Sequence, residues 1–295
     1  MTEDLAPRVE RITGAAPVSW KARAAAWQPT EAIEGGNRRF SVLLDDGRRV
    51  FVKAAAAAHT ASWIRREHEV YANLRGSFIP RLVGFDDDPI EPVLVIEDLS
   101  DADWEVHWDD VRVAGVRSAL AELAISPAPP STRPVREAFA GLFGRWHVVA
   151  EDPGPFLSTR IRSEAWLERA LPTLLVAADR IRADGEDLLH LDVRSDNLCF
   201  RDGHAILVDW NWCCTGNADL DVAAWLPSLA REGGPQPWKV LPGAGDYAAF
   251  LAGVWAAAVG LPAPPTAPTV REGQRSQLVV ALGWCERELG ITPDV

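Results

Sequence analysis

The sequence predicts an α+β fold with two lobes: a small antiparallel sheet with one helix, followed by a larger, mainly helical lobe. Short apolar runs separated by turn residues fill the first third of the chain, whereas apolar residues at helical spacing dominate after Trp108. At 295 residues the chain is long enough for one large domain or two modest ones. We place the boundary near Asp98–Ser100, which assigns residues 1–98 to an N-terminal lobe and 99–295 to a C-terminal lobe.

The first predicted element of the N-terminal lobe is a hairpin. Its strands, Ser41–Asp45 and Arg49–Lys53, flank Asp46-Gly47, which is a strong turn signal between apolar runs. The remaining elements expected in this lobe are a helix and two apolar strands, at 60–74, 81–85 and 92–99.

Helices dominate the prediction for the C-terminal lobe, at 109–125, 136–149, 163–183, 220–231, 247–261 and 271–289. A compact β insert is expected between the third and fourth of them, with strands at 188–192, 198–200 and 205–209. The longest uncharged stretch, Tyr247–Val270, is interrupted by glycines and prolines. We therefore expect a buried helix there and not a membrane span.

The chain is acidic, with 30 basic and 42 acidic residues and a net charge of −12. A phosphate surface would repel such a protein, so we expect no nucleic-acid partner and no membrane partner. The charge is uneven, with 13 basic and 15 acidic groups in residues 1–98 (net −2) and 17 and 27 in residues 99–295 (net −10). The N-terminus lacks a signal-peptide pattern and the four cysteines lack C-x-x-C spacing, so we expect a cytoplasmic protein with free thiols.

The most informative segment is Leu188–Phe200, which places His190, Asp192 and Asn197 in H-x-D-x-x-x-x-N spacing. Asp209 ends an apolar run twelve residues after Asn197. Such a set can converge on one point and suits phosphoryl transfer, in which one acid orients the substrate hydroxyl while Asn and a second Asp hold Mg²⁺. Two other interpretations remain open: a structural turn with no chemistry, and a metallohydrolase that uses His190 and Asp192.

These motifs resemble the catalytic and metal-binding loops of the aminoglycoside phosphotransferase and choline-kinase-like small-molecule kinases, distant relatives of protein kinases. The resemblance implies a protein-kinase-like fold with a nucleotide-binding N-terminal lobe. It also implies that Asp192 is the catalytic base, that Asn197 and Asp209 are the metal ligands, and that His190 is a structural hinge of the loop. Asp221, in Asp219-Leu-Asp221, would brace the catalytic loop.

A lysine on a strand is the next requirement of a kinase, because it holds the α- and β-phosphates together with a helix acid. Lys53 ends the run Val50-Phe-Val-Lys53, which is of the V-A-I-K type. Only three of the 30 basic residues are lysines, so a lysine here departs from the habit of the chain. The alternative is a solvated lysine at the end of a strand.

Glu67 is the predicted partner of Lys53. The helix that follows the hairpin has an expected buried stripe of Trp63, Val70 and Leu74. Glu67 falls on that stripe, whereas Glu69 lies on the opposite face. A carboxylate on a buried stripe needs a paired cation, and Lys53 is the available one.

Two further segments complete the expected nucleotide site. Gly35-Gly36-Asn37 precedes the first hairpin, where the family keeps a loop over the phosphates, so Gly36 and Asn37 are candidate contacts. A plain turn is the alternative. Val93–Leu99 resembles the family's connector between lobes, whose backbone around Glu97 and Leu99 would hydrogen-bond the adenine.

The chain departs from the family in the catalytic loop. Leu191 stands between the loop His and Asp, where the family usually has Gly, and we expect tighter packing there. Arg194 lies two residues after Asp192, where protein kinases place a lysine that contacts the transferred phosphate. Arg194 either stabilises the γ-phosphate charge or pairs with Asp196.

The acceptor contacts are expected in the helical lobe. The segment 100–110 combines five acids with two Trp, which suits a cationic ligand through ion pairs and cation–π contacts, although a helix N-terminus explains the same acids. The candidate acceptor residues are Asp101, Asp103, Trp104, Trp210, Trp212 and Glu286.

Together these features predict an O-phosphotransferase that uses ATP (GTP is not excluded) and Mg²⁺ to phosphorylate a hydroxyl of a small cationic molecule, such as an aminoglycoside or another basic antibiotic. The alternatives are a metabolic kinase of the same fold, acting on a sugar, amino alcohol or nucleoside, and a nucleotide-binding scaffold without activity. The complete set of motifs argues against the scaffold. Monomer and homodimer both remain open.

Overall fold

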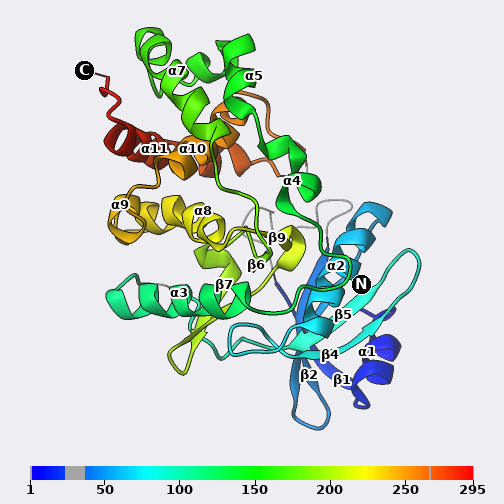
Figure 1. The fold of residues 1–295 in the computed structure, drawn as a ribbon. Helices are drawn as coiled ribbons and strands as arrows, with labels where there is room; N and C mark the ends of the chain where they lie inside the picture. Colours follow the sequence, from blue (N-terminus) through cyan, green and yellow to red (C-terminus); the bar gives the residue numbers. More distant parts are fainter. Residues whose placement is uncertain (1, 24–36, 106, 266, 295) are drawn as a thin grey trace.

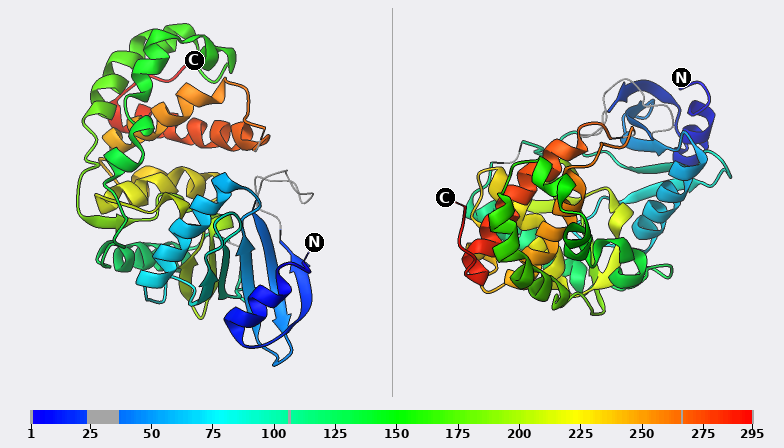
Figure 2. Two further views of the ribbon diagram at one scale, coloured as in Figure 1. Left: turned by 90° about the vertical axis from the view of Figure 1, so that its right-hand side faces the viewer. Right: turned by 90° about the horizontal axis from the view of Figure 1, so that it is seen from above.

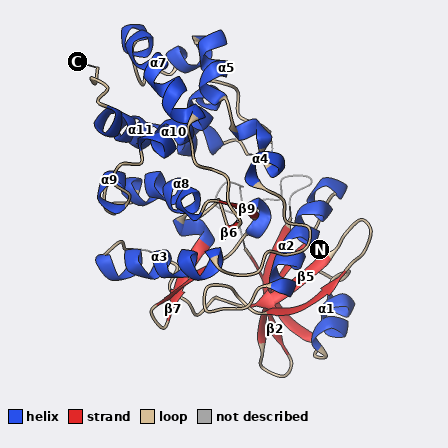
Figure 3. Ribbon diagram, in the orientation of Figure 1, coloured by secondary structure: helices blue, strands red, loops and turns tan. Residues whose placement is uncertain are grey.

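The computed structural model describes residues 2–23, 37–105, 107–265 and 267–294. It has two lobes, with a sheet in the N-terminal lobe and stacked helices in the C-terminal lobe (Figure 1). Two further views, each turned by 90°, show the N-terminal sheet beside the helices of the C-terminal lobe (Figure 2). Strands outside the N-terminal lobe form only short pairs at its border (Figure 3). The predicted α+β class and the two-lobed arrangement are confirmed.

The N-terminal lobe is one antiparallel sheet of order β1-β2-β3-β5-β4 with two helices. Its elements are α1 Ala6–Thr13, β1 Pro17–Ala22, β2 Arg38–Leu44, β3 Arg49–Ala54, α2 Ala58–Asn73, β4 Leu82–Asp86 and β5 Val93–Glu97. The predicted hairpin is β2–β3, and the predicted helix and two strands are α2, β4 and β5. The sequence analysis did not anticipate α1 and β1.

Strand alternation decides what each face of this sheet contacts. Val50 and Val52 of β3 point into a small core with α1, together with Val95 of β5. Lys53 and Phe51 therefore point to the other face, where α2 lies. The period of two thus places Lys53 opposite Glu67.

The buried stripe of α2 differs by one position from the prediction. Trp63 is 44% exposed, so placing it on the buried stripe was wrong. Ile64, Tyr71 and Leu74 are buried and lie on the same face as Glu67, at spacings of three, four and seven residues. The choice of face for Glu67 survives because the stripe begins one residue later.

The C-terminal lobe is built from helices around a buried central helix. Its helices are α3 Asp110–Ala124, α4 Val135–Ala138, η1 Ala140–Leu142, α5 Arg145–Glu151, α6 Gly154–Ser158, α7 Glu164–Asp179, α8 Ala218–Arg231, α9 Pro237–Val240, α10 Gly245–Val259 and α11 Val270–Leu289. The uncharged stretch forms α10, which packs against α5, α6, α7, α8 and α11. Among the described residues, no helix is both long and apolar enough to cross a membrane.

One predicted helix of this lobe is wrong. The segment 136–149 is not continuous but divides into α4, η1 and α5. Gly144 caps the start of α5 with a left-handed φ of 66°. A helix cannot run through a residue in that conformation, and glycine adopts it without steric penalty.

The β insert contains two strand pairs that carry the catalytic loop between them. β6 Asp187–Leu189 pairs with β9 Cys214–Gly216, and β7 Leu198–Arg201 pairs with β8 His204–Leu207. The short helix η2 Ser195–Asn197 precedes β7, and the short helix η3 Trp210–Trp212 follows β8. The predicted strand 188–192 ends at Leu189, because Leu191 has a left-handed φ of 58°.

Close backbone contact requires glycine at Gly260, the end of α10. A Cβ added there would lie 1.7 Å from the carbonyl oxygen of Pro155. Gly260→Ala should therefore lower the free energy of unfolding, measured in urea, by about 1–3 kcal/mol through overpacking. Gly283, in α11, has no heavy atom within 4 Å of such a Cβ. Gly283→Ala is the matched control and should raise stability by about 0.5–1 kcal/mol. Equal effects at both sites would contradict this account.

Candidate active site

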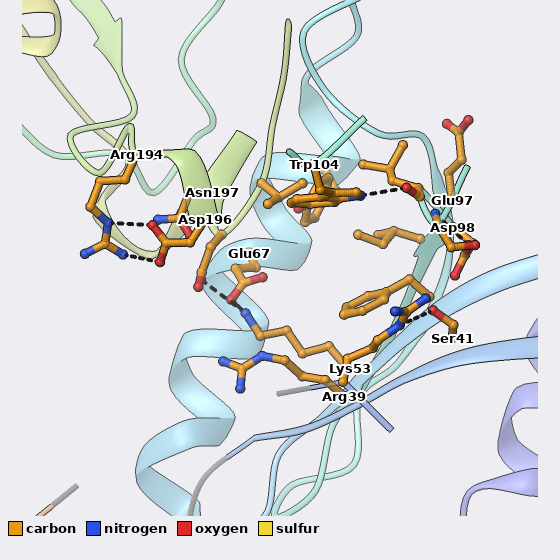
Figure 4. Close-up of a pocket in the computed structure, with 18 residues that line it drawn as sticks. Arg39, Ser41, Lys53, Glu67, Glu97, Asp98, Trp104, Arg194, Asp196 and Asn197 are labelled. Atoms are coloured by element: carbon orange, nitrogen blue, oxygen red, sulfur yellow. Dashed lines mark hydrogen bonds and ion pairs between the residues drawn. The ribbon is translucent and has the colours of Figure 1, made fainter. Parts of the chain in front are cut away.

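A cavity of about 480 Å³ lies between the sheet, α2, the connector after β5 and the catalytic loop. Side chains from both lobes point into it (Figure 4). The sequence-predicted residues that line it are Lys53, Glu67, Glu97, Leu99, Trp104, Arg194, Asn197 and Asp209. The structure thus brings together motifs that lie more than 150 residues apart in the chain.

Lys53 is the centre of a buried ion-pair cluster. Its Nζ contacts Glu67 Oε1, as predicted, and lies 3.2 Å from Asp209 Oδ1. The Lys53 and Glu67 side chains are 5% and 2% exposed. Burial alone would raise the pKa of Asp209, but the charges of Lys53 and Arg39 hold it well below its ordinary value. Asp209 is therefore ionised at neutral pH.

Asn197 connects the catalytic loop to Asp209. Its Nδ2 donates to Asp192 O at 2.9 Å and to Asp192 Oδ2 at 2.8 Å. The N–H of Val208, the residue before Asp209, donates to the Asn197 carbonyl at 2.9 Å. Asn197 therefore has its amide nitrogen engaged with Asp192, and its side-chain oxygen is the end suited to a cation.

Asp192 has the properties of a base at neutral pH. Burial, together with the charges of Asp209 and Asp196, raises the pKa of Asp192 to about 7. The charge of Arg194 and the hydrogen bond from Asn197 act in the opposite direction. A base whose pKa lies near the working pH can accept a proton and still be regenerated.

Arg194 pairs with two carboxylates of its own loop. Its Nη2 lies 3.3 Å from Asp192 Oδ2, and its Nε lies 3.1 Å from Asp196 Oδ1. The pairing with Asp196 is one of the two roles considered from the sequence. Arg194 also lines the cavity, which leaves its contact with a phosphate as a proposal.

His190 is a buried group that holds the backbone of Asp192. It is completely buried, and burial lowers its pKa to about 4, so the ring is neutral. The Asp192 N–H donates to His190 Nδ1 at 3.2 Å. Nε2 therefore carries the proton and donates to the Val208 carbonyl at 3.0 Å. The neutral ring therefore connects the backbone of Asp192 to Val208, the residue before Asp209.

Asp221 holds the backbone of the catalytic loop. Its carboxylate accepts from the N–H groups of His190 at 2.7 Å and Leu191 at 2.8 Å. Leu191 is in the left-handed region, which costs a residue with a Cβ about 1–2 kcal/mol. The expected tighter packing is thus a strained backbone, stabilised by the two hydrogen bonds to Asp221.

The connector after β5 offers backbone groups to a base. Within the described part of the chain, the Leu99 N–H makes no hydrogen bond, while the Leu99 carbonyl accepts from Trp104 Nε1 at 2.8 Å. The carboxylate of Glu97 is already hydrogen-bonded. It accepts from Arg201 Nη1 at 2.6 Å and from the Arg81 N–H at 3.1 Å.

The donor set fits a magnesium ion better than a transition metal. Asn197 and Asp209 supply oxygen, the atom that Mg²⁺ prefers. Across the residues that the structure describes, no group of three or more His, Cys, Asp or Glu could hold a metal ion. Two protein oxygens, completed by phosphates and water, are what a magnesium–nucleotide site requires.

The structure does not support several predicted acceptor contacts. Trp210 was wrongly placed in the acceptor site, because it is completely buried against Phe78 and His190. Both oxygens of Glu286 pair with Arg162, at 2.8 and 3.1 Å, so its contact with an acceptor stays a prediction.

The acidic segment after the connector is divided in its contacts. Asp103 pairs with Arg112, and its backbone bridges to Phe200, while Asp101 is exposed. Trp104 lines the nucleotide-sized cavity, which differs from the acceptor role that we expected. Trp212 is 39% exposed, and its ring lies tilted against that of Phe139, with 4.7 Å between the ring centroids.

The loop expected over the phosphates lies mostly outside the described residues. Gly36 is among the residues that are not described. Asn37 directly precedes β2, and its buried Oδ1 has no hydrogen-bond partner in the described part of the chain.

Sequence reasoning missed several lining residues. Arg39 lies directly across the β2–β3 ladder from Lys53, and Phe51 lies opposite Ser41. The Asp46-Gly47 turn fixes that register, so counting back from the turn would have found Arg39. Asn211, two residues after Asp209, donates to Asp209 and Glu67. Its only sequence signal was a polar residue just after the Asp.

Leu191 allows a direct test of the strained loop. At a left-handed φ, Gly is favoured over Ala, so Leu191→Gly should be about 1 kcal/mol more stable than Leu191→Ala in urea unfolding. The order reverses at an ordinary exposed helical position, where Ala121→Gly should cost about 1 kcal/mol. Finding Leu191→Ala the more stable of the pair would show that no strain exists there.

Comparisons with known proteins agree with this geometry. The profile of a family described as the phosphotransferase enzyme family matches residues 30–264. A comparison with curated proteins gave no match.

Solved structures share the fold at low identity. The macrolide 2'-phosphotransferase of Brachybacterium faecium is 14% identical, covers 100% of this chain and 99% of its own, and superposes with a TM-score of 0.54. An amicoumacin kinase in complex with AMP-PNP, Ca²⁺ and Ami is 12% identical over 96% and 94% of the chains, with a TM-score of 0.52.

A choline/ethanolamine kinase family protein from Mesorhizobium loti is 12% identical over 98% of this chain and 95% of its own, with a TM-score of 0.51. These likenesses concern the fold, whereas the family profile spans most of the sequence. The chain therefore belongs to the phosphotransferase enzyme family and is a small-molecule kinase.

Proposed function

We propose that the chain transfers the γ-phosphate of ATP, with Mg²⁺, to a hydroxyl of a small cationic molecule such as an aminoglycoside or another basic antibiotic. One observation carries the proposal: Lys53, Asn197 and Asp209 line one cavity, although they come from both lobes, and Asn197 hydrogen-bonds Asp192 beside it. We divide the lobes at residues 98 and 99, because β5 ends at Glu97 and the connector follows.

The nucleotide would lie between the connector and Lys53. The Leu99 N–H is available to an adenine acceptor, and the Phe51 and Trp104 rings supply apolar surface for a flat base. Lys53 would contact the α- and β-phosphates, held in place by Glu67. Asn37, which directly precedes β2, would contact the phosphates. GTP is the alternative phosphate donor.

Asn197 and Asp209 would hold the metal ion through their side-chain oxygens. Mg²⁺ neutralises charge on the phosphates of the nucleotide when it is bound. The ionised state of Asp209, maintained by Lys53 and Arg39, keeps this ligand ready without a proton to displace.

Asp192 would orient the acceptor hydroxyl and accept its proton. Its pKa of about 7 suits that role, and Asn197 and the His190 ring fix its position. Arg194, which lies beside Asp192 and lines the cavity, would stabilise the charge on the transferred phosphate.

The charge of the C-terminal lobe supports a cationic acceptor, since residues 99–295 have 17 basic and 27 acidic groups. The solved structures with this fold are described as a macrolide phosphotransferase, an amicoumacin kinase and a choline/ethanolamine kinase family protein. Such varied acceptors on one fold mean that the acceptor must be argued from this chain itself. Trp212 and Asp101, both exposed, are the remaining candidate contacts.

ADP release tests the proposal most directly. Purified protein is incubated with Mg²⁺ and ATP or GTP, and with a panel of aminoglycosides, other basic antibiotics, amino alcohols, sugars and nucleosides. Turnover with cationic antibiotics supports a resistance enzyme. Selective turnover of an uncharged sugar or nucleoside would instead identify a metabolic kinase. The absence of turnover with every hydroxyl compound in the panel would overturn the proposal.

The catalytic base gives the sharpest single variant. Asp192→Asn should lower kcat about a hundred- to ten-thousand-fold, because the amide cannot accept the proton. Binding of ATP, measured by calorimetry, should change little. Asp202→Asn, in the turn between β7 and β8, is the matched control, because it makes the same substitution on the hairpin that follows the loop and should keep full activity. Undiminished turnover by the Asp192 variant would contradict the mechanism.

A further inference from the structure

Asn211 is bound to the same two carboxylate oxygens as Lys53. Its Nδ2 donates to Glu67 Oε1 at 3.0 Å and to Asp209 Oδ1 at 2.5 Å. Lys53 Nζ contacts Glu67 Oε1 as well, and lies 3.2 Å from Asp209 Oδ1. Two donors and two acceptors thus close a ring that joins β3, α2 and η3.

The charge of this ring explains why a neutral donor is useful. Glu67 and Asp209 contribute two negative charges when ionised and Lys53 one positive charge, so the two carboxylates repel each other across a single ammonium. Asn211 adds a donor to both oxygens without adding charge. When both carboxylates are ionised the ring is therefore net negative, which favours a divalent cation at Asp209; a second lysine in place of Asn211 would cancel that charge.

The backbone of Asn211 is held from α2 as well. Arg66 Nη1 donates to the Asn211 carbonyl at 3.1 Å, so neighbouring residues of α2 contact both the main chain and the side chain of Asn211. Asp209 has a left-handed φ of 67°, a conformation that a residue with a Cβ seldom adopts. The contacts to α2 lie two residues after this strained position and oppose its relaxation.

The orientation of the amide is determined by the carboxylates. Reversing the amide would point its oxygen at two carboxylate oxygens, which cannot donate when ionised. The buried Oδ1 of Asn211 has no partner within the described residues, and a buried acceptor without a partner has a free-energy cost. That cost is compatible with a stable fold only if the bonds to Glu67 and Asp209 offset it.

We propose that Asn211 is a positioning residue: it couples α2 to Asp209 and holds Asp209 Oδ1, so that the second oxygen, Oδ2, faces a cation. In the part of the chain that the structure describes, Asp209 Oδ2 has no hydrogen bond. This inference rests on the proposed function, because the cation is the Mg²⁺ that accompanies the nucleotide. Asn211 itself touches neither the acceptor nor the base.

Cation binding tests the proposal apart from turnover. Asn211→Leu keeps the approximate volume and removes the donor, and Asn211→Ala provides a second variant should the first not fold. Mg²⁺ is titrated into the protein with AMP-PNP and followed by calorimetry, and adenosine binding and the melting temperature are measured alongside. Asn73→Ala is the control, because Asn73 is an exposed amide of α2 whose side chain donates to the Glu69 carbonyl.

We expect at least one Asn211 variant to bind Mg²⁺ about tenfold more weakly, as for other residues that orient a metal ligand. Adenosine affinity and melting temperature should stay close to wild type, and the control should be unchanged throughout. Unaltered Mg²⁺ affinity in both variants would overturn the proposal. So would a parallel loss of adenosine binding and melting temperature, which would assign Asn211 a general structural role. Wild-type protein that binds neither AMP-PNP nor adenosine would instead refute the proposed function.

Discussion

The buried ammonium of Lys53 is the constraint on which the rest of this structure depends. Removing a cation from water costs several kcal/mol unless oppositely charged groups surround it, and here Glu67 of α2 and Asp209, two residues after β8, do so. Neither carboxylate can move far without leaving a buried charge unpaired. The sheet, α2 and the segment after β8 are therefore held in one arrangement, and the cavity lies where they meet.

Hydrogen bonds behind the cavity also fix the position of Asp192. Asp221 accepts two backbone hydrogen bonds from the loop, and the neutral His190 ring connects Asp192 to Val208. The left-handed Leu191 lies between them, where the related kinases usually have glycine. Backbone strain at such a point persists only where its neighbours determine the conformation. The loop thus stays rigid through hydrogen bonding, although its sequence does not favour that backbone.

Local sequence patterns predicted much of the fold and part of the site. The Asp46-Gly47 turn predicted the β2–β3 hairpin, and helical spacing predicted α2 and α10 within a few residues. Predictions failed where a residue's conformation or partner depends on distant chain: the left-handed Gly144 and Leu191 ended expected elements, and β9 formed only because β6 is beside it. The burial of Trp210 and the pairing of Glu286 with Arg162 likewise depend on packing that residue type does not reveal.

Sequence alone determined the reaction class, since the spacing of His190, Asp192, Asn197 and Asp209 reflects chemistry that needs those groups on one short loop and its hairpin. It also determined the identity of the Lys53 partner, because an acid on a buried helical stripe must be paired. Only the tertiary structure decided that Arg39, Phe51 and Asn211 join the site and that Trp104 lies beside the connector. The reason is physical: spacing along the chain orders residues within an element, whereas contacts between lobes follow from how whole elements pack.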